Sequence, residues 1–175
     1  MSIALELTVS LKIPDVTALT ARRALQGPMG YGEVLGDLTR ADWWRLDLDV
    51  ETEDEALSLA RELAEQTNVF VNPNKHVFRV AAHAGLREPR GGLTPVGVLT
   101  GFKDDAKAAL ALDALQGRLG YGGRVVGLEL GTLWTFWLRE SDPAKACDLA
   151  GRMTVTEDRH SGLLANPHSM WWRAL

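Results

Sequence analysis

The sequence predicts an α+β fold made of two copies of one βαββαβ unit. Two observations predict it: a short segment that recurs in the second half of the chain, and strand and helix patterns that follow in the same order in both halves. The nine residues of Ala24–Gly32 return as Ala114–Gly122 with seven identities, at an offset of 90 residues. A chain of 175 residues therefore contains two such copies.

The repeat keeps its register beyond this segment. The same offset pairs Trp44 with Trp134 without a gap. The offset then grows to 94 at an Asn-Pro dipeptide, which occupies residues 72–73 and 166–167. The difference places four additional residues in the last loop of the second copy, around Thr156–Gly162.

The first copy begins with a predicted strand and a predicted helix. Apolar and polar side chains alternate over residues 5–11, which is the pattern of a half-buried strand. Asp15 is a suitable N-cap for a helix that is expected to run to Leu25. Gly27 and Gly30 are expected to end this helix and to form a turn.

Two strands, a second helix and a last strand are expected next. Apolar and acidic residues alternate over 46–51, at the later of the two strands. Thr52 and Glu55 have the spacing of a capping box, and the apolar stripe of the helix that they begin extends to Leu63. A short strand over Lys75–Ala81 completes the first copy.

The second copy repeats this order. Its expected elements are a strand over Val96–Phe102, a helix over Asp104–Leu119, strands over Arg124–Leu130 and Leu133–Glu140, a helix over Asp142–Met153 and a strand over Ser169–Ala174. The dipeptide Asp142-Pro143 is a favourable N-cap and first-turn pair for the last helix.

These elements divide the chain into a first repeat over residues 1–82, a linker over 83–95 and a second repeat over 96–175. A βαββαβ order on a four-stranded antiparallel sheet is the ferredoxin-like arrangement, in which both helices cover one face. The other face of each sheet is then open. Because two open faces can cover each other, we expect the two repeats to form an intramolecular pseudo-dimer. A homodimer of the fused pair is a further expectation.

Aromatic residues are more numerous on the predicted strands than one helix-covered face requires. Neighbouring residues of a strand point to opposite faces, so several of these side chains must point away from the helices. Large exposed apolar surfaces usually mark interfaces. The candidates for a partner interface are Trp43, Trp44, Trp134, Phe136, Trp137, Trp171 and Trp172.

Composition and charge exclude several classes of protein. No apolar run reaches the roughly 20 residues that span a bilayer, and the N-terminus lacks the pattern of a secretory leader. The net charge of −4 disfavours nucleic-acid binding, and residues 1–85 are more acidic than residues 86–175. The single Cys147 cannot form an internal disulfide. We therefore expect a cytoplasmic protein that binds neither nucleic acid nor membrane.

The glycine-rich segments do not predict a phosphate site. GPMGYG and GRLGYGG follow predicted helices, whereas a phosphate-binding loop precedes one. We interpret these segments as helix ends and turns, and Tyr31 and Tyr121 within them as packing residues.

Other candidate residues also have structural interpretations. The pairs Asp47 with Asp49 and Asp104 with Asp105 fit a solvated strand face and a helix start, respectively. Cys147 lies at a helical position and is interpreted as a small packed side chain. The histidines beside the two Asn-Pro dipeptides do not align with each other. The sequence therefore predicts no catalytic residue, no cofactor and no metal site.

Both copies resemble PurS, the small subunit of bacterial phosphoribosylformylglycinamidine synthase. In the first copy the resemblance rests on the strand Leu5–Lys12, on Ala24-Leu25 and on the Gly30-Tyr31 turn; in the second copy it rests on Leu163–Pro167. The family's Val-Arg-x-Gly-Lys stretch is absent, since Leu38–Asp42 and Leu128–Thr132 occupy its place.

The resemblance implies a non-catalytic protein that acts as a dimer and bridges the glutaminase and synthetase subunits of this enzyme in de novo purine biosynthesis. A fused pair would replace the homodimer. Two other classes also fit the expected fold. A small-molecule-binding regulatory module predicts a tryptophan-lined pocket at the junction between the repeats, and a dimeric ferredoxin-like barrel enzyme predicts a partly buried acid or histidine between two sheets.

Overall fold

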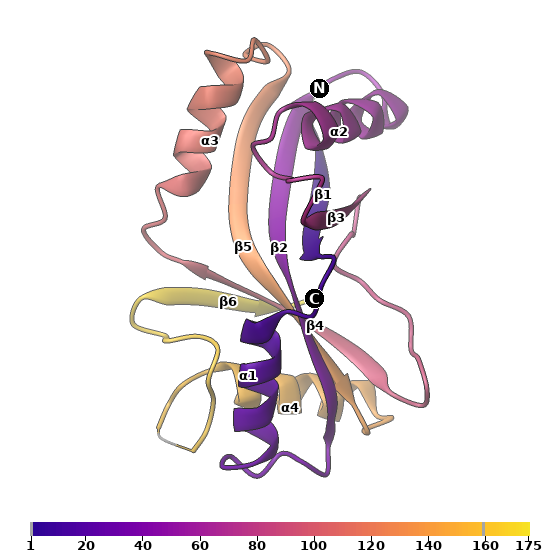
Figure 1. Ribbon diagram of the computed structural model, residues 1–175, viewed down its shortest axis with the longest axis vertical. Helices are drawn as coiled ribbons and strands as arrows, with labels where there is room; N and C mark the ends of the chain where they lie inside the picture. The colour runs from indigo at the N-terminus through magenta and orange to yellow at the C-terminus, as the bar shows by residue number, and fades with distance from the viewer. Residues whose placement is uncertain (1, 159) are drawn as a thin grey trace. The chain divides into compact units, whose positions relative to one another are not determined.

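The computed structural model describes residues 2–158 and 160–175 (Figure 1). Its strands are β1 (Ser2–Leu11), β2 (Leu35–Asp49), β3 (His76–Ala81), β4 (Thr94–Phe102), β5 (Val125–Leu138) and β6 (Met170–Ala174). Its helices are α1 (Val16–Gln26), α2 (Glu53–Gln66), α3 (Lys107–Gln116) and α4 (Pro143–Thr154). Within these described residues, no helix is long and apolar enough to cross a membrane. Strands and helices in this proportion confirm the α+β class.

The helix starts follow the expected capping chemistry. The carboxylate of Asp15 accepts hydrogen bonds from the backbone N–H groups at the start of α1, at 2.9 and 3.1 Å. The hydroxyl of Thr52 accepts from the N–H of Glu55 at the start of α2. Asp142 caps α4, whose first residue is Pro143. These three local predictions are confirmed.

Each copy contributes three strands instead of the expected four. The separate strands expected over Arg124–Leu130 and Leu133–Glu140 form the single strand β5, and β2 is the equivalent long strand of the first copy. A two-residue hairpin requires a turn with positive φ values. The residues between the two expected strands remain extended instead, and Thr132 pairs with Thr100 of β4.

The contacts of the chain define two compact units, and each unit contains parts of both copies. Unit 1 consists of residues 1–13, 42–85 and 105–131, and unit 2 consists of residues 14–41, 86–104 and 132–175. The chain passes from one unit to the other within β2 and within β5. The repeat boundaries at residues 82 and 96 therefore mark the duplication of the sequence, whereas the compact units cut across it.

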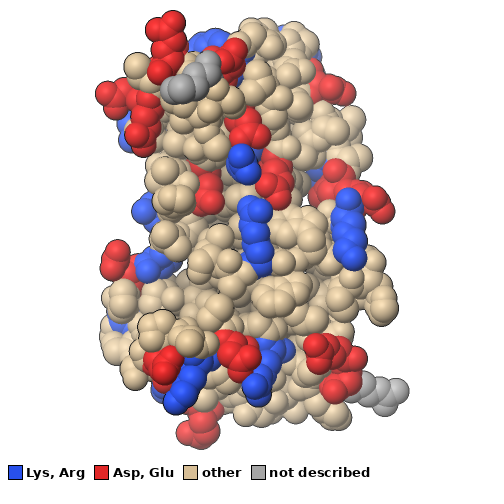
Figure 2. Space-filling model, turned by 180° about the vertical axis from the view of Figure 1, so that it is seen from behind, with Lys and Arg blue, Asp and Glu red and all other residues tan. Residues whose placement is uncertain are grey.

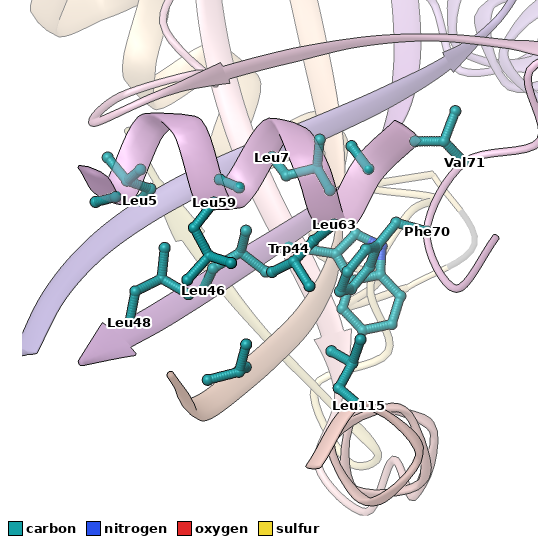
Figure 3. Close-up of a cluster of buried hydrophobic side chains, with 14 of the residues drawn as sticks. Leu5, Leu7, Trp44, Leu46, Leu48, Leu59, Leu63, Phe70, Val71 and Leu115 are labelled. Carbon is teal, nitrogen blue, oxygen red and sulfur yellow. The ribbon is translucent and has the colours of Figure 1, made fainter. Parts of the chain in front are cut away.

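Unit 1 combines β3, β1, the second half of β2 and the first half of β5, within the overall strand order β3-β1-β2-β5-β4-β6. The printed register is antiparallel, with Leu7 opposite Trp44 on β2 and opposite Val80 on β3. Helix α2 from the first copy and α3 from the second pack on one core, which includes Leu5, Leu46, Leu59, Leu63, Phe70 and Leu115 (Figure 3).

Unit 2 contains the equivalent elements, but here the second copy supplies most of the strands and the first copy supplies part of one strand and a helix. It combines the first half of β2, the second half of β5, β4 and β6. Val98 lies opposite Trp134 on β5 and opposite Ala174 on β6. Helix α1 from the first copy and α4 from the second contribute Leu25 and Met153 to its core. Each core is therefore built by one helix from each copy.

Candidate functional site

The structure buries five of the seven residues expected at a partner interface. Trp43, Trp44, Trp134, Phe136 and Trp137 are buried. Trp171 and Trp172 lie on the edge strand β6, where Trp171 is partly buried and Trp172 is 41% exposed. Of the seven, only these two are accessible to another molecule in the described structure.

The buried aromatic residues have packing roles within their own units. Trp44 meets Phe70 edge to face in unit 1, with ring centroids 4.9 Å apart (Figure 3). In unit 2, the Nε1 atom of Trp134 donates a hydrogen bond to the hydroxyl of Thr100 at 3.2 Å. The hydroxyl thereby satisfies the indole donor that strand packing removes from water.

An ion cluster attaches the linker to unit 2. Arg90 lies 2.9 Å from one carboxylate oxygen of Asp37, while Arg22 lies 2.9 Å from the other. The guanidinium of Arg90 also lies over the ring of Trp137, 3.8 Å from its centroid. No sequence motif predicts this cluster. The only available signal was that Asp37 has a glycine, Gly127, at the equivalent position.

The carboxylate and histidine candidates occupy structural positions. Asp47 pairs with Arg45 on the same strand at 3.1 Å. Asp105 accepts a hydrogen bond from the backbone N–H of Lys107 at the start of α3. The Nδ1 atom of His76 accepts from the backbone N–H of Asn72. No group of three or more metal-ligating side chains occurs within the described part of the chain.

The two Gly-Tyr turns form as predicted and connect the two copies. Gly30 and Gly120 have φ values of 81° and 79°, which a side chain would disfavour. The Tyr121 hydroxyl donates to the carboxylate of Glu62 at 2.8 Å in unit 1. The Tyr31 hydroxyl donates to the backbone carbonyl of Ser161 at 3.1 Å in unit 2. Each tyrosine thus bonds to the copy that does not contain it.

The hydrogen bond in unit 1 has an electrostatic consequence. The Glu62 carboxylate accepts a hydrogen bond from the Tyr121 hydroxyl, and this bond is the main cause that raises the pKa of Tyr121 above its ordinary value. Desolvation of the phenol raises the pKa further. The nearby Arg124 acts in the opposite direction. The neutral phenol is therefore the form that unit 1 stabilises.

A groove of about 720 Å³ lies beside α4 in unit 2, and we call it the α4 groove. Its lining includes Tyr31, Cys147, Gly151, Arg152, Glu157 and Trp172. Tyr31 belongs to the first copy and the other five belong to the second. The groove therefore lies at a junction between the sequence copies, although all of its residues belong to unit 2.

The charges of the α4 groove come from its helix and from the loop that follows the helix. Arg152 pairs with Asp148 one helical turn earlier, at 2.8 Å, and both side chains are more than half exposed. Glu157 adds a second carboxylate. Ser161 organises this loop, because its hydroxyl accepts hydrogen bonds from the backbone N–H groups of Glu157 and Asp158.

A second hollow, of about 500 Å³, lies beside α1 in unit 2. Its lining includes Val16, Thr20, Trp134, Leu163 and Leu164. Its apolar members come from α1, from Trp134 of β5 and from the segment that follows the four additional residues. Both hollows therefore flank the part of the chain in which the second copy departs from the first.

The buried polar residues within the described chain are Thr8, Thr100, Thr135 and Thr154. Comparisons with protein-family models, with curated proteins and with solved structures found no match. The duplication consequently provides the comparison for this chain, because most positions of one unit have a counterpart in the other.

Proposed function

We propose that the chain is a PurS-like, non-catalytic subunit that bridges the glutaminase and synthetase subunits of a phosphoribosylformylglycinamidine synthase. The observation that carries this proposal is that each compact unit contains one helix and part of a long strand from the other copy. Two copies joined in this manner form an interlocked pair. Such a pair is what a fused replacement for a homodimer requires.

Each unit is a ferredoxin-like domain assembled from both copies under this proposal. The sheet of unit 1 has the order β3, β1, the second half of β2, and the first half of β5. Of these, β5 alone belongs to the second copy. A ferredoxin-like sheet has this order when the second strand is supplied by the other copy. The helix before that strand, α3, then accompanies it into the same unit.

The short motifs behind the family resemblance have equivalent roles in the two copies, which supports a common origin. The ammonium group of Lys12 donates a hydrogen bond to the carbonyl of Pro73 at 2.6 Å, and that of Lys103 donates one to the carbonyl of Pro167 at 2.8 Å. These bonds attach each Asn-Pro turn to the end of the first strand of its own copy.

A fused pair can present two different surfaces, which a symmetric homodimer cannot. Unit 1 carries 8 basic and 13 acidic side chains, a net charge of −5, whereas unit 2 carries 11 and 10, a net charge of +1. Figure 2 shows one face of the molecule, on which basic and acidic side chains are interspersed. Different net charges favour two dissimilar partners.

The edge strand β6 is the proposed contact with one partner. Trp172 is 41% exposed there, and aromatic side chains are enriched at the centres of protein interfaces. An edge strand also offers unpaired backbone groups to a partner strand. Trp171 and Trp172 are therefore the two members of the original set that remain interface candidates.

The experiment is to mix the purified chain with the glutaminase and synthetase subunits from the same cell, with and without glutamine and ADP. Size-exclusion chromatography would detect the complex, and glutamine-dependent amidine formation would detect ammonia transfer. We expect co-elution and a gain of activity that requires this chain. Failure to form a complex and failure to raise the activity would together contradict the proposal.

A pair of variants tests the location of the contact. Trp172→Ala should weaken complex formation by about tenfold, which is a common loss for an aromatic interface residue. Phe102→Ala removes another exposed aromatic side chain of unit 2 and is the matched control. Equal effects of the two variants would contradict a contact through β6.

A further inference from the structure

The duplication gives most residues of the α4 groove a counterpart in unit 1; Glu157 and Ser161 lie in the segment that the second copy gained. Along the helix the offset is 90 residues, and along the last strand it is 94. The equivalent pairs are Ala144 and Asp54, Cys147 and Leu57, Gly151 and Arg61, and Ala174 and Val80. In each pair the residue that lines the groove is the smaller one. At these four positions unit 2 has lost side-chain volume, whereas Asp148, Arg152 and Trp172 are larger than their counterparts Ser58, Glu62 and Phe78.

Unit 1 fills the equivalent space with its own side chains. Leu57 and Val80 are partly buried and pack against the core of unit 1. The smaller Cys147 and Ala174 line an open groove of about 720 Å³ in unit 2. The side chains that line an unfilled apolar hollow lose packing contacts, which lowers stability. The need for tight packing therefore does not explain the groove. A volume of this size is typical of small-molecule sites.

The four additional residues of the second copy help to form the rim of the groove. Glu157 and Ser161 belong to this segment and line the groove. Tyr31 fixes the segment by its hydrogen bond to the carbonyl of Ser161. The smaller side chains of α4 and β6 and the longer loop after α4 therefore border the same groove.

The groove combines an aromatic wall with an excess of negative charge. A Cβ atom at Gly151 would lie 3.4 Å from the Trp172 ring, so the edge of this ring rests against the helix while the side chain remains 41% exposed. The charged residues among the described lining are Asp148, Glu157 and Arg152. Asp148 already compensates Arg152 at 2.8 Å, which leaves the charge of Glu157 as the excess.

We propose that the α4 groove binds a small aromatic molecule that carries a protonated amine. The aromatic ring packs against Trp172 above the small residues of α4, and the ammonium group pairs with the carboxylate of Glu157. A cation near Trp172 is also attracted by the ring itself. A ligand-binding module is expected to have a tryptophan-lined pocket, and the α4 groove is our candidate for it. This proposal does not depend on the proposed bridging function.

Cys147 provides a direct assay, since it lines the groove, is exposed, and is the only cysteine of the chain. The rate of its alkylation by iodoacetamide would be measured with increasing tryptamine, indole or indole-3-acetate. We expect saturable protection by tryptamine, at a concentration about tenfold lower than for indole-3-acetate, because one favourable ion pair is replaced by repulsion. No protection by tryptamine, or equal protection by the anion, would overturn the proposal.

Variants that copy unit 1 into unit 2 separate binding from folding. Gly151→Arg places the residue of unit 1 in the groove and should raise the tryptamine midpoint more than about tenfold, because it occupies the space for the ring. Arg61→Gly makes the reciprocal change in unit 1 and should leave the midpoint unchanged.

Glu157→Gln is the second variant, and it tests the amine in a chain whose groove keeps its shape. It should weaken tryptamine by about fivefold or more while leaving indole unaffected, since only tryptamine loses an ion pair. If Gly151→Arg does not fold, this variant alone decides. An unchanged ratio of tryptamine to indole midpoints would overturn the role of the carboxylate and with it the proposed ligand class.

Discussion

Units 1 and 2 share one hydrogen-bonded framework but differ in how completely that framework is filled. In both units a glutamine at the end of a helix donates to a strand carbonyl, Gln26 to Leu35 at 2.8 Å and Gln116 to Val125 at 2.9 Å. The Gly-Tyr turn that follows is also the same in both. The comparison indicates that backbone-directed hydrogen bonds preserve the fold while side-chain volume is free to change.

The filling also differs at the two equivalent tryptophans, Trp44 and Trp134. Trp44 meets the ring of Phe70, whose counterpart beside Trp134 is the smaller Leu164. A hollow of about 500 Å³ lies at this place in unit 2. In unit 1 Phe70 packs against Trp44, whereas in unit 2 the smaller Leu164 lines a hollow in which a ligand can bind.

The largest expected effect tests this difference in packing. Phe70→Ala should lower the free energy of unfolding by about 3–5 kcal/mol, because it removes a buried ring and leaves a cavity beside Trp44. Leu164→Ala should cost less than about half as much, since Leu164 is partly exposed beside an existing hollow. Urea denaturation of both variants measures the two losses, and equal losses would contradict the comparison.

The next prediction concerns the shared framework. Gln26→Ala and Gln116→Ala should each lower the free energy of unfolding by about 1–3 kcal/mol, because a carbonyl of a buried residue loses its side-chain donor. The loss for Gln26→Ala should be equal or larger, by up to about 1 kcal/mol, since Gln26 also accepts a hydrogen bond from the Nε atom of Arg22 at 3.2 Å. A much larger loss at one of the two positions would show that the framework is not equivalent in the two units.

Much of the local structure could be predicted from the sequence, because its determinants lie within a few residues. The caps at Asp15, Thr52 and Asp142 and the turns at Gly30 and Gly120 depend on neighbouring backbone groups. The duplication was evident from direct repetition of the sequence. These features required no knowledge of long-range contacts.

The exchange of elements between the copies could not be predicted, because it depends on a turn that does not form. The alternation over β5 is the same for one strand of 14 residues as for two short strands. Once the strand continues, its halves must join different units. This exchange brings Tyr31 to Ser161 and so creates the α4 groove, although Cys147 and its counterpart Leu57 were visible in the sequence alignment.

A smaller effect distinguishes the two tyrosines. Tyr121→Phe should lower the free energy of unfolding by about 1.5 kcal/mol, because its hydroxyl donates to a carboxylate, and Tyr31→Phe by about 0.5–1 kcal/mol, because its acceptor is a neutral carbonyl. Thermal unfolding of both variants measures the difference. A greater loss for Tyr31→Phe would contradict this order.

The same contact predicts a dependence on pH. The pKa of Tyr121 is raised in the folded protein, so its contribution to stability is present below the pKa of the unfolded chain and is lost as pH rises through the folded value. Alkaline loss of stability should therefore be smaller in Tyr121→Phe than in the unmodified chain. Unfolding midpoints measured from neutral pH to above pH ~10 test this prediction.

The smallest expected effect makes unit 2 more like unit 1. Gly151→Ala should raise the free energy of unfolding by about 0.5–1 kcal/mol, because alanine favours the helical conformation of α4 more than glycine does. The new methyl group would meet the Trp172 ring at 3.4 Å, which is an ordinary contact that requires no rearrangement. Arg61→Gly should cost a similar amount in α2.

The sign of this last effect separates two explanations of the glycine. If Gly151→Ala stabilises the chain, then Gly151 is not needed for folding, and the space beside Trp172 is available for the aromatic ring of a ligand. If the variant is less stable, Gly151 is required by the packing of Trp172 on α4. Differential scanning calorimetry of Gly151→Ala, with the exposed Arg61→Gly of α2 as the control for helix propensity, distinguishes these outcomes.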